Sequence, residues 1–218
     1  MKFNEKLKEA ASKDQNLDWA NLSYYWEKNE QLAKTSIVED LTIFMGDSIT
    51  EEWGREYSDF FQSPSRINRG IGGQTTPQML IRFKQDVVLL NPKTVVLLAG
   101  TNDIAGNTGP SSTDMICNNI FSMADIAHEN GIRIIICSIL PVFEYPWAEH
   151  IKNVPDTIEE INNKLKSFTK KNGMVFLDYY SQMVDSNRGL MGKYTTDGVH
   201  LNLKGYKVMS RVVKEVLL

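Results

Sequence analysis

Short hydrophobic runs alternate along the chain with longer stretches in which hydrophobic residues recur every three or four positions. Most of the runs are rich in Val, Ile and Leu, which is typical of strands that are buried on both faces of a sheet. We predict four such strands and one weaker one, in the order Leu41–Met45, Arg66–Asn68 (the weaker), Val95–Ala99, Ile132–Cys137 and Met174–Leu177.

The stretches between the runs have the spacing of amphipathic helices. Thr76 is the predicted N-cap of the first helix, and Asp156 with Glu159 resembles a capping box for the third. Gly131 and Gly173 are predicted to end the second and third helices. The periodic segments are Leu80–Leu90, Ile116–Ala127, Ile158–Phe168 and Tyr206–Val216.

Strand and helix alternate in the rhythm of right-handed βαβ units around a parallel sheet. We therefore predict an α/β fold, a three-layer α/β/α sandwich with a five-stranded parallel sheet, as a single domain over residues 1–218. Residues 1–40 carry no strand signal and are interpreted as a helical extension packed on that domain, with a lid or a dimer contact as the alternative. The extension is rich in aromatic residues, namely Trp19, Tyr24, Tyr25 and Trp26.

Composition excludes several classes of function. The chain is 42% hydrophobic and 23% charged, as soluble globular proteins are, and its net charge of -3 argues against binding nucleic acid. No stretch approaches the roughly 20 apolar residues of a membrane span. Cys/His spacing typical of zinc sites is lacking, so we predict no metal and no cofactor. Whether the chain forms a homo-oligomer stays open.

The N-terminus is lysine-rich and has no apolar segment of the kind found in signal peptides. Cys117 and Cys137 lie in a predicted helix and a predicted strand, where two buried thiols are more common than a disulfide. We therefore predict a cytoplasmic protein. A mature exported protein that had lost its leader would look the same.

Polar residues and glycines gather where the predicted strands end. Ligands bind at the carboxyl ends of the strands in an open parallel sheet, so these segments are candidate site loops. Three of the segments follow strands, and the fourth precedes the last helix and could reach the same edge. They are Gly46–Thr50, Gly70–Thr75, Gly100–Asp103 and Asp197–His200.

The side chains in these segments match the needs of acyl transfer. A serine hydroxyl becomes a good nucleophile when an imidazole takes its proton, and a carboxylate holds the imidazole in the required tautomer. Fixed N–H donors then stabilise the oxyanion of the tetrahedral intermediate. Ser48, His200 and Asp197 supply the first three groups, and Gly73 and Asn102 supply the donors. The sequence therefore predicts a serine esterase.

The same four segments resemble the ordered blocks of the GDSL/SGNH hydrolases, and within them the branch of the platelet-activating-factor acetylhydrolases. The resemblance runs from about Leu41 to the C-terminus. It implies a flavodoxin-like sandwich in which Ser48 is the nucleophile, His200 the general base and Asp197 the residue that orients the histidine.

The resemblance also implies an oxyanion hole made by the Ser48 amide, the Gly73 amide and the Asn102 side chain. Many relatives have Ser-Gly in the second block where this chain has Gly72-Gly73. The glycine that donates its amide is therefore left open between Gly72 and Gly73.

The loop over residues 141–155 follows the fourth predicted strand and should overhang the active edge. The resemblance to the acetylhydrolase branch implies a short acyl group, acetate in the simplest case. Aromatic faces pack against sugar rings and carboxylates accept hydrogen bonds from hydroxyls, so from the loop we expect the alcohol of the ester to be a carbohydrate. A surface loop held by aromatic packing is the alternative. The candidate substrate-binding residues are Tyr145, Trp147 and His150 in this loop, with Asp47 beside the nucleophile.

Two other functions stay open at this point. A lysophospholipase or thioesterase for longer acyl chains would use the same catalytic residues, and sequence does not give the length of the pocket. A flavodoxin-like binding module without catalysis is disfavoured, because Glu51 and Glu52 would repel a phosphate at the helix that follows the first strand.

Overall fold

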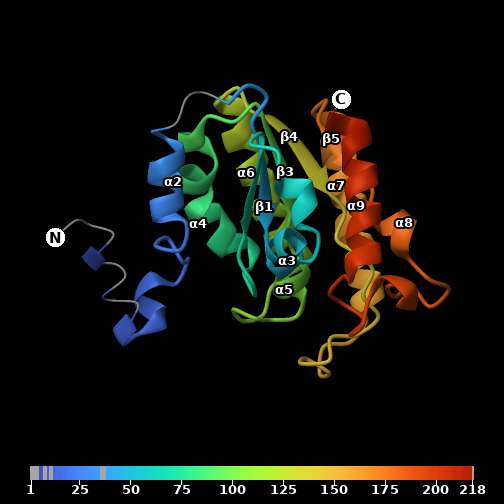
Figure 1. The fold of residues 1–218 in the computed structure, drawn as a ribbon. Helices are drawn as coiled ribbons and strands as arrows, with labels where there is room; N and C mark the ends of the chain where they lie inside the picture. Colours follow the sequence, from blue (N-terminus) through green and yellow to red (C-terminus); the bar gives the residue numbers. More distant parts are fainter. Residues whose placement is uncertain (1–4, 7–8, 10–11, 35–37, 218) are drawn as a thin grey trace.

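The protein was analysed as a computed structural model, which describes residues 5–6, 9, 12–34 and 38–217. Within these residues, five parallel strands form one sheet in the order β2-β1-β3-β4-β5, flanked by helices on both faces (Figure 1). The predicted α/β fold is confirmed, and each predicted strand is found. The strands are β1 Thr42–Gly46, β2 Arg66–Gly70, β3 Thr94–Leu98, β4 Arg133–Cys137 and β5 Val175–Leu177.

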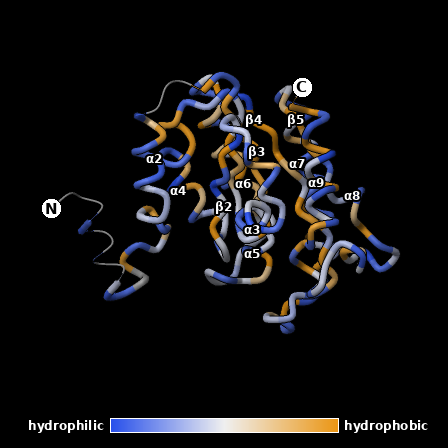
Figure 2. The backbone as a smooth tube through the Cα atoms, viewed as in Figure 1, coloured by the Kyte–Doolittle hydropathy of each residue, from blue (hydrophilic) through white to orange (hydrophobic). Residues whose placement is uncertain are grey.

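Alternate residues of each strand face opposite layers, because successive side chains of a strand point to opposite sides of the sheet. Ile43 and Val95 belong to a core with α4, α6 and α7, whereas Phe44 and Val96 belong to a core with α3, α8 and α9. Figure 2 shows the hydrophobic residues concentrated between these layers. The helices are α2 Trp26–Leu32, α3 Ser48–Glu56, α4 Thr76–Asp86, α5 Thr101–Ile104, α6 Thr113–Glu129, α7 Val154–Lys171, α8 Tyr180–Met183 and α9 Leu203–Leu217, with 3-10 turns at Gln15–Asp18, Ser58–Phe61, Val88–Leu90 and Gly192–Tyr194.

Two predicted helix starts are wrong by one to three residues. Thr75, not Thr76, is the N-cap of α4 and forms a capping box with Gln78. The predicted capping box of Asp156 with Glu159 does not form, because α7 begins earlier, at Val154. Proline fits the first turn of a helix, so the prolines that follow Thr76 and Val154 allow both helices to start before the predicted caps.

Residues 12–34 pack against α4 and the end of β2. The Tyr25 hydroxyl donates to the Gly70 carbonyl, and Asn29 Nδ2 donates to Asp86 Oδ1 over 2.6 Å. Three glutamines, at 74, 78 and 85, donate in turn to backbone carbonyls of this segment. Residues 1–4, 7–8, 10–11 and 35–37 of the predicted extension lie outside the described residues.

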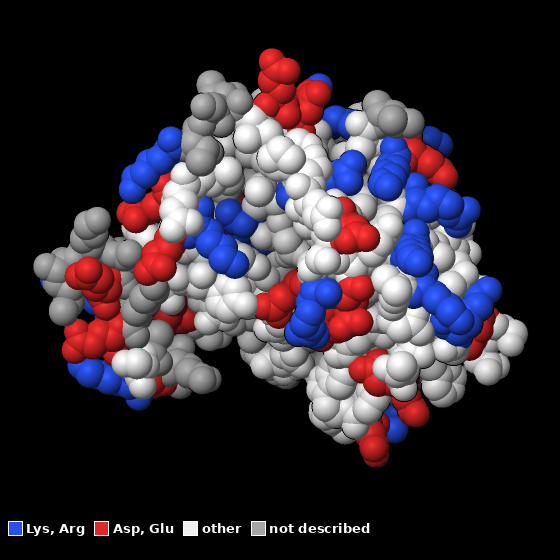
Figure 3. Space-filling view, viewed as in Figure 1, with Lys and Arg blue, Asp and Glu red and all other residues white. Residues whose placement is uncertain are grey.

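Acidic and basic side chains are interspersed over most of the face shown in Figure 3, and a row of basic side chains lies along α9. The exposed cations on that helix are Lys204, Lys207, Arg211 and Lys214. Among the residues with described placement, no helix has the length and hydrophobicity needed to cross a membrane.

Candidate active site

Three side chains from the two ends of the sequence meet at the carboxyl edge of the sheet. Ser48 Oγ lies 3.1 Å from His200 Nε2, and His200 Nδ1 lies 2.7 Å from Asp197 Oδ2. The hydroxyl, imidazole and carboxylate thus form a continuous hydrogen-bonded chain. The structure brings together all three residues that the sequence singled out for nucleophilic chemistry.

A tight turn before α9 holds the histidine in place. Asp197 Oδ1 accepts the backbone N–H groups of Val199 and His200 at 2.9 and 2.8 Å, and the Thr195 hydroxyl donates to the His200 carbonyl. Gly198 has a φ of +84°, which a glycine adopts without strain. One carboxylate therefore both shapes the turn and contacts the imidazole.

The charge of Asp197 is set by competing effects. Partial burial raises its pKa, but the hydrogen bonds from the His200 ring and from the Val199 and His200 amides outweigh it and bring the pKa to about 2. The carboxylate is therefore ionised under ordinary conditions and is able to stabilise a protonated imidazole.

Ser48 is the first residue of α3, directly after the end of β1. Asp47 is the N-cap, and its Oδ1 accepts the Ile49 N–H over 3.0 Å. A Cβ at Gly46 would lie 2.1 Å from Thr50 Oγ1, so only glycine fits the sharp turn into the helix. The Ser48 N–H points out of the helix N-terminus, where backbone amides have no partner within the helix.

Two further donors face the same edge. Gly72 donates its N–H to Glu51 Oε2 at 2.9 Å, whereas the Gly73 N–H has no acceptor among the described residues. Asn102 is buried, and its Nδ2 donates to the Gln74 carbonyl over 3.0 Å. Because the Gly72 amide is already engaged, the geometry favours Gly73 as the backbone donor.

A buried arginine contacts both the turn before Ser48 and the loop that contains Gly73. Arg82 of α4 is fully buried and donates to the Gly46 carbonyl at the end of β1, to Gln74 Oε1 and to Asp86 Oδ2. The turn between β1 and α3 and the Gly72–Thr75 loop are thus held by one guanidinium. Sequence reasoning missed Arg82, because its position on α4 resembles any polar position of an amphipathic helix.

The four candidate substrate-binding residues have different environments. Trp147 is 47% exposed, and its ring centroid lies 6.0 Å from that of His200; His150 is exposed as well. Asp47 and Tyr145 are 1% and 0% exposed, so neither offers a surface to a substrate. The structure gives these two supporting roles instead, Asp47 as the N-cap of α3 and Tyr145 as a buried neighbour of Trp147 that is hydrogen-bonded to Thr101.

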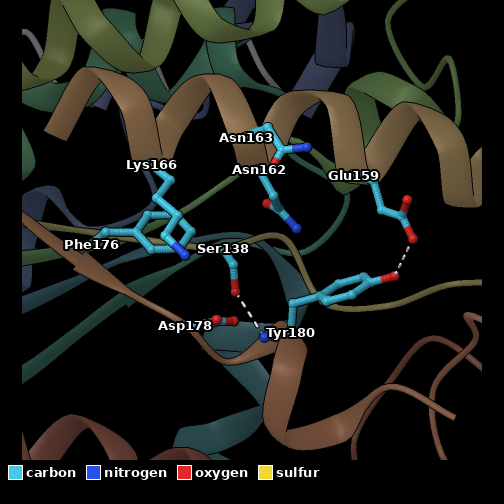
Figure 4. Close-up of a pocket in the computed structure, with 8 residues that line it drawn as sticks. All are labelled: Ser138, Glu159, Asn162, Asn163, Lys166, Phe176, Asp178 and Tyr180. Carbon is cyan, nitrogen blue, oxygen red and sulfur yellow. Dashed lines mark hydrogen bonds between the residues drawn. The ribbon is translucent and has the colours of Figure 1, made fainter. Parts of the chain in front are cut away.

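A separate hollow lies between α7 and the start of α8, at the ends of β4 and β5 (Figure 4). Ser138 Oγ accepts the Tyr180 N–H over 2.8 Å, and the Tyr180 hydroxyl donates to Glu159 over 3.1 Å. None of the predicted catalytic residues lines this hollow, so it is not part of the candidate active site. Its lining is Ser138, Glu159, Asn162, Asn163, Lys166, Phe176, Asp178 and Tyr180.

The carboxyl of Asp47, the residue before Ser48, is buried, and its Oδ2 has no hydrogen-bond partner in the described structure. Burial raises its pKa to about 7, against the opposing effects of the Ile49 N–H and His200, while Asp103 adds to the rise. Burial also raises the pKa of Asp103, to about 6. Both carboxyls thus hold their protons more tightly in the folded protein than in the unfolded chain.

This burial makes stability dependent on pH. Between about pH 4 and pH 7 the folded protein keeps a proton on Asp47 that the unfolded chain has lost, so the free energy of unfolding falls as the pH rises through this window. Asp47→Asn should make that fall shallower, as measured by urea unfolding at pH 5 and pH 8. The control is Asp125→Asn, at an exposed carboxylate on α6. An equal fall in wild type and Asp47→Asn would contradict the prediction.

Known proteins resemble this chain in sequence and in fold. The model of the GDSL-like Lipase/Acylhydrolase family matches residues 44–208. A proposed acylhydrolase from Bacteroides fragilis is 44% identical, with a TM-score of 0.89 over 91% of this chain and 96% of that one. A GDSL-like lipase from Bacteroides thetaiotaomicron is 42% identical, with a TM-score of 0.88 over 91% of this chain and 97% of that one.

Curated relatives are more distant. The platelet-activating factor acetylhydrolase IB subunit alpha2 of Rattus norvegicus is 25% identical over 182 residues, 81% of this chain and 75% of that protein. The uncharacterised lipoprotein YqeF of Bacillus subtilis is 28% identical over 130 residues, 52% of this chain, and the match spans about half of that protein, 53%. An acetylxylan esterase of Xylanibacter ruminicola is 22% identical over 204 residues, 78% of this chain and 41% of that protein. With the family match extending over most of the sheet and all four candidate loops, the chain belongs to the GDSL-like lipase/acylhydrolase family and is a GDSL-type hydrolase.

Proposed function

We propose that this hydrolase is a serine esterase that removes a short acyl group, acetate in the simplest case, from a carbohydrate. The observation that carries the mechanism is the hydrogen-bonded chain from Ser48 Oγ through the His200 ring to Asp197, with distances of 3.1 and 2.7 Å. Such a chain supports the proposal because a nucleophile, a general base and an orienting carboxylate act in acyl transfer through hydrogen bonds in this order.

In the first half of the proposed reaction, Ser48 Oγ attacks the ester carbonyl carbon while His200 Nε2 takes the hydroxyl proton. The ionised Asp197 stabilises the resulting imidazolium. The oxyanion accepts hydrogen bonds from the Ser48 and Gly73 amides and from Asn102 Nδ2. As the intermediate collapses, the leaving alcohol takes the proton from His200, and an acyl-enzyme on Ser48 remains.

In the second half, water replaces the alcohol. His200 removes a proton from the water as it attacks the acyl carbon, and the same three donors receive the second oxyanion. Collapse returns the proton to Ser48 Oγ and releases the carboxylic acid. The chain's own groups account for every proton in this cycle.

The surroundings of the catalytic residues support the carbohydrate half of the proposal. Trp147 exposes an aromatic ring beside His200. A hollow that Asp197 helps to line combines the exposed ring of Phe143 with the Glu144 and Asp185 carboxylates. Aromatic faces and carboxylates together suit a hydroxyl-rich group better than a lipid tail. The acetylxylan esterase relative supports the same substrate class.

The test is a chain-length series of p-nitrophenyl esters together with a panel of acetylated sugars. We expect the highest rate on the acetate ester, release of acetate from at least one sugar, and a raised KM on that sugar for Trp147→Ala but not for Trp147→Phe, which keeps an aromatic ring. A rate that peaks at octanoate, with no acetate released from any sugar, would favour the lysophospholipase or thioesterase alternative.

We also propose a cytoplasmic location. Cys117 and Cys137 are both buried thiols without a disulfide, as expected in a reducing compartment. Cell fractionation tests this proposal, and recovery of the protein outside the cytoplasm would overturn it.

A further inference from the structure

Asn107 lies in the turn that follows α5, beside the two donors assigned above to the oxyanion. The turn is closed by a hydrogen bond from the Asn107 N–H to the Asn102 carbonyl over 3.0 Å, and the glycines at 106 and 109 have φ of +76° and +104°. Such φ values are accessible to glycine without strain, so the loop can fold back on itself. The Asn107 side chain thereby contacts the Gly72–Thr75 loop.

One amide group of Asn107 contacts both donors. Its Nδ2 donates to Asn102 Oδ1 over 2.9 Å and to the Gly73 carbonyl over 3.2 Å. Nothing in the proposed reaction uses Asn107 directly. Its contacts are instead with the Asn102 side chain and the Gly73 backbone, the two groups proposed to stabilise the oxyanion.

The contact with Asn102 decides which end of that side chain faces the substrate. The two ends of a side-chain amide have nearly the same shape, but one donates and the other accepts hydrogen bonds. In the observed orientation Oδ1 receives the Asn107 amide, and Nδ2 is left to donate to the Gln74 carbonyl and to an oxyanion. The reverse orientation would turn Oδ1 toward the oxyanion and would place two oxygens, Oδ1 and the Gln74 carbonyl, against each other.

The contact with Gly73 completes a second restraint. The donor N–H of Gly73 belongs to the peptide between Gly72 and Gly73. Glu51 holds the peptide before it, through the Gly72 N–H, and Asn107 holds the peptide after it, through the Gly73 carbonyl. The donor peptide thus lies between two fixed neighbours, which limits its rotation.

We propose that Asn107 is a positioning residue for the oxyanion hole, which sets the orientation of the Asn102 amide and restrains the Gly73 peptide. The inference rests on the proposed function, because it assumes that these two groups stabilise an oxyanion. It adds a residue that touches neither the nucleophile nor the substrate but determines whether the donors are correctly aimed.

The test is a double-mutant cycle on p-nitrophenyl acetate with Asn107→Leu, which keeps the size of the side chain but removes the donor. Removing the donor itself by Asn102→Ala should lower kcat by about 10²–10³. Asn107→Leu should lower kcat by at least about tenfold, up to that same limit, with little change in KM, because the oxyanion exists only in the transition state and the intermediates. The double variant Asn102→Ala/Asn107→Leu should have a kcat at most about threefold below that of Asn102→Ala alone, since Asn107 acts largely through Asn102.

Asn107→Asp gives a sharper version of the test. Its carboxylate offers only acceptors to Asn102 Oδ1 and the Gly73 carbonyl, so the Asn102 amide should turn over to donate to it. We expect a lower kcat than for Asn107→Leu. The matched control is Asn172→Leu at the end of α7, which loses a comparable 2.8 Å bond to the Phe168 carbonyl and should keep the wild-type kcat.

The outcomes separate this inference from the proposed function. Thermal unfolding of each variant is measured first, and rates are compared at a temperature at which all of them are folded. If Ser48 is required for hydrolysis but Asn107→Leu keeps kcat within threefold of wild type, the positioning role is refuted. If the loss caused by Asn107→Leu multiplies in full with that of Asn102→Ala, Asn107 does not set the orientation of Asn102, and that part of the inference is refuted. If hydrolysis does not require Ser48, the proposed function itself fails.

Discussion

Ser48→Ala should lower kcat for p-nitrophenyl acetate by about 10⁴–10⁶, with the protein still folded. Ser48 Oγ is the hydroxyl that lies within hydrogen-bond distance of His200 Nε2, and the loss of one oxygen removes the atom that would carry the acyl group. His200→Ala should have a comparable effect. Because the residues act as one unit, the double variant should be hardly slower than either single one.

The control for this prediction is Ser122→Ala, at an exposed serine on α6 that bonds only to its own helix. The kcat of Ser122→Ala should equal that of the wild type. Ser48→Ala and Ser122→Ala should both show the wild-type circular dichroism spectrum. Hydrolysis by Ser48→Ala within tenfold of wild type would exclude this serine as the nucleophile.

The second large effect is on stability. Arg82→Met should lower the free energy of unfolding by about 3–5 kcal/mol, as expected when one partner of a buried ion pair is removed. Both Arg82 and Asp86 have fully buried side chains, with 3.0 Å between Arg82 Nη1 and Asp86 Oδ2. Burial lowers the pKa of the arginine, and the Asp86 carboxylate opposes this shift. The substitution would leave that carboxylate and the Gly46 carbonyl without their strongest donor.

The double variant Arg82→Met/Asp86→Leu separates the two contributions to this loss. Removing the carboxylate together with its partner leaves no unpaired member of this ion pair, so part of the lost stability should return. Urea unfolding of the wild type, Arg82→Met and the double variant measures the effect. A loss below about 1 kcal/mol for Arg82→Met would show that water or another group replaces the guanidinium.

The strands and helices were predictable because many consecutive or regularly spaced hydrophobic residues mark each of them. A strand such as β3 is a run of β-branched and leucine residues that are buried on both faces, and helices such as α6 repeat hydrophobic residues over several turns. The ends of helices were less predictable, since Thr75 and Thr76 are chemically alike and only the backbone conformation decides which one caps α4.

The catalytic candidates were predictable for a different reason. Parallel strands place their carboxyl ends at one edge, so residues such as Ser48 and Asn102 could be assigned to one site from their positions after strands. Contacts between side chains could not be assigned in this way. In the same loop, Tyr145 is buried while Trp147 is exposed, and sequence spacing in an irregular loop does not distinguish the two. Asn107 was missed for the same reason, because its role depends on how a glycine-containing turn folds back.

The N-terminal segment has a consequence for where this protein can be cut. Similarity to the family starts at residue 44, yet Asn29 is hydrogen-bonded to both Asp86 and Arg69, and the Ala20 carbonyl accepts a hydrogen bond from Gln74. A chain trimmed to the boundary of similarity would leave a buried carboxylate, a guanidinium and an amide of the loop beside Gly73 with missing partners. The polar contacts of the fold thus reach beyond the region matched by the family model, and expression or grafting of this hydrolase should take its limits from the contacts of the segment.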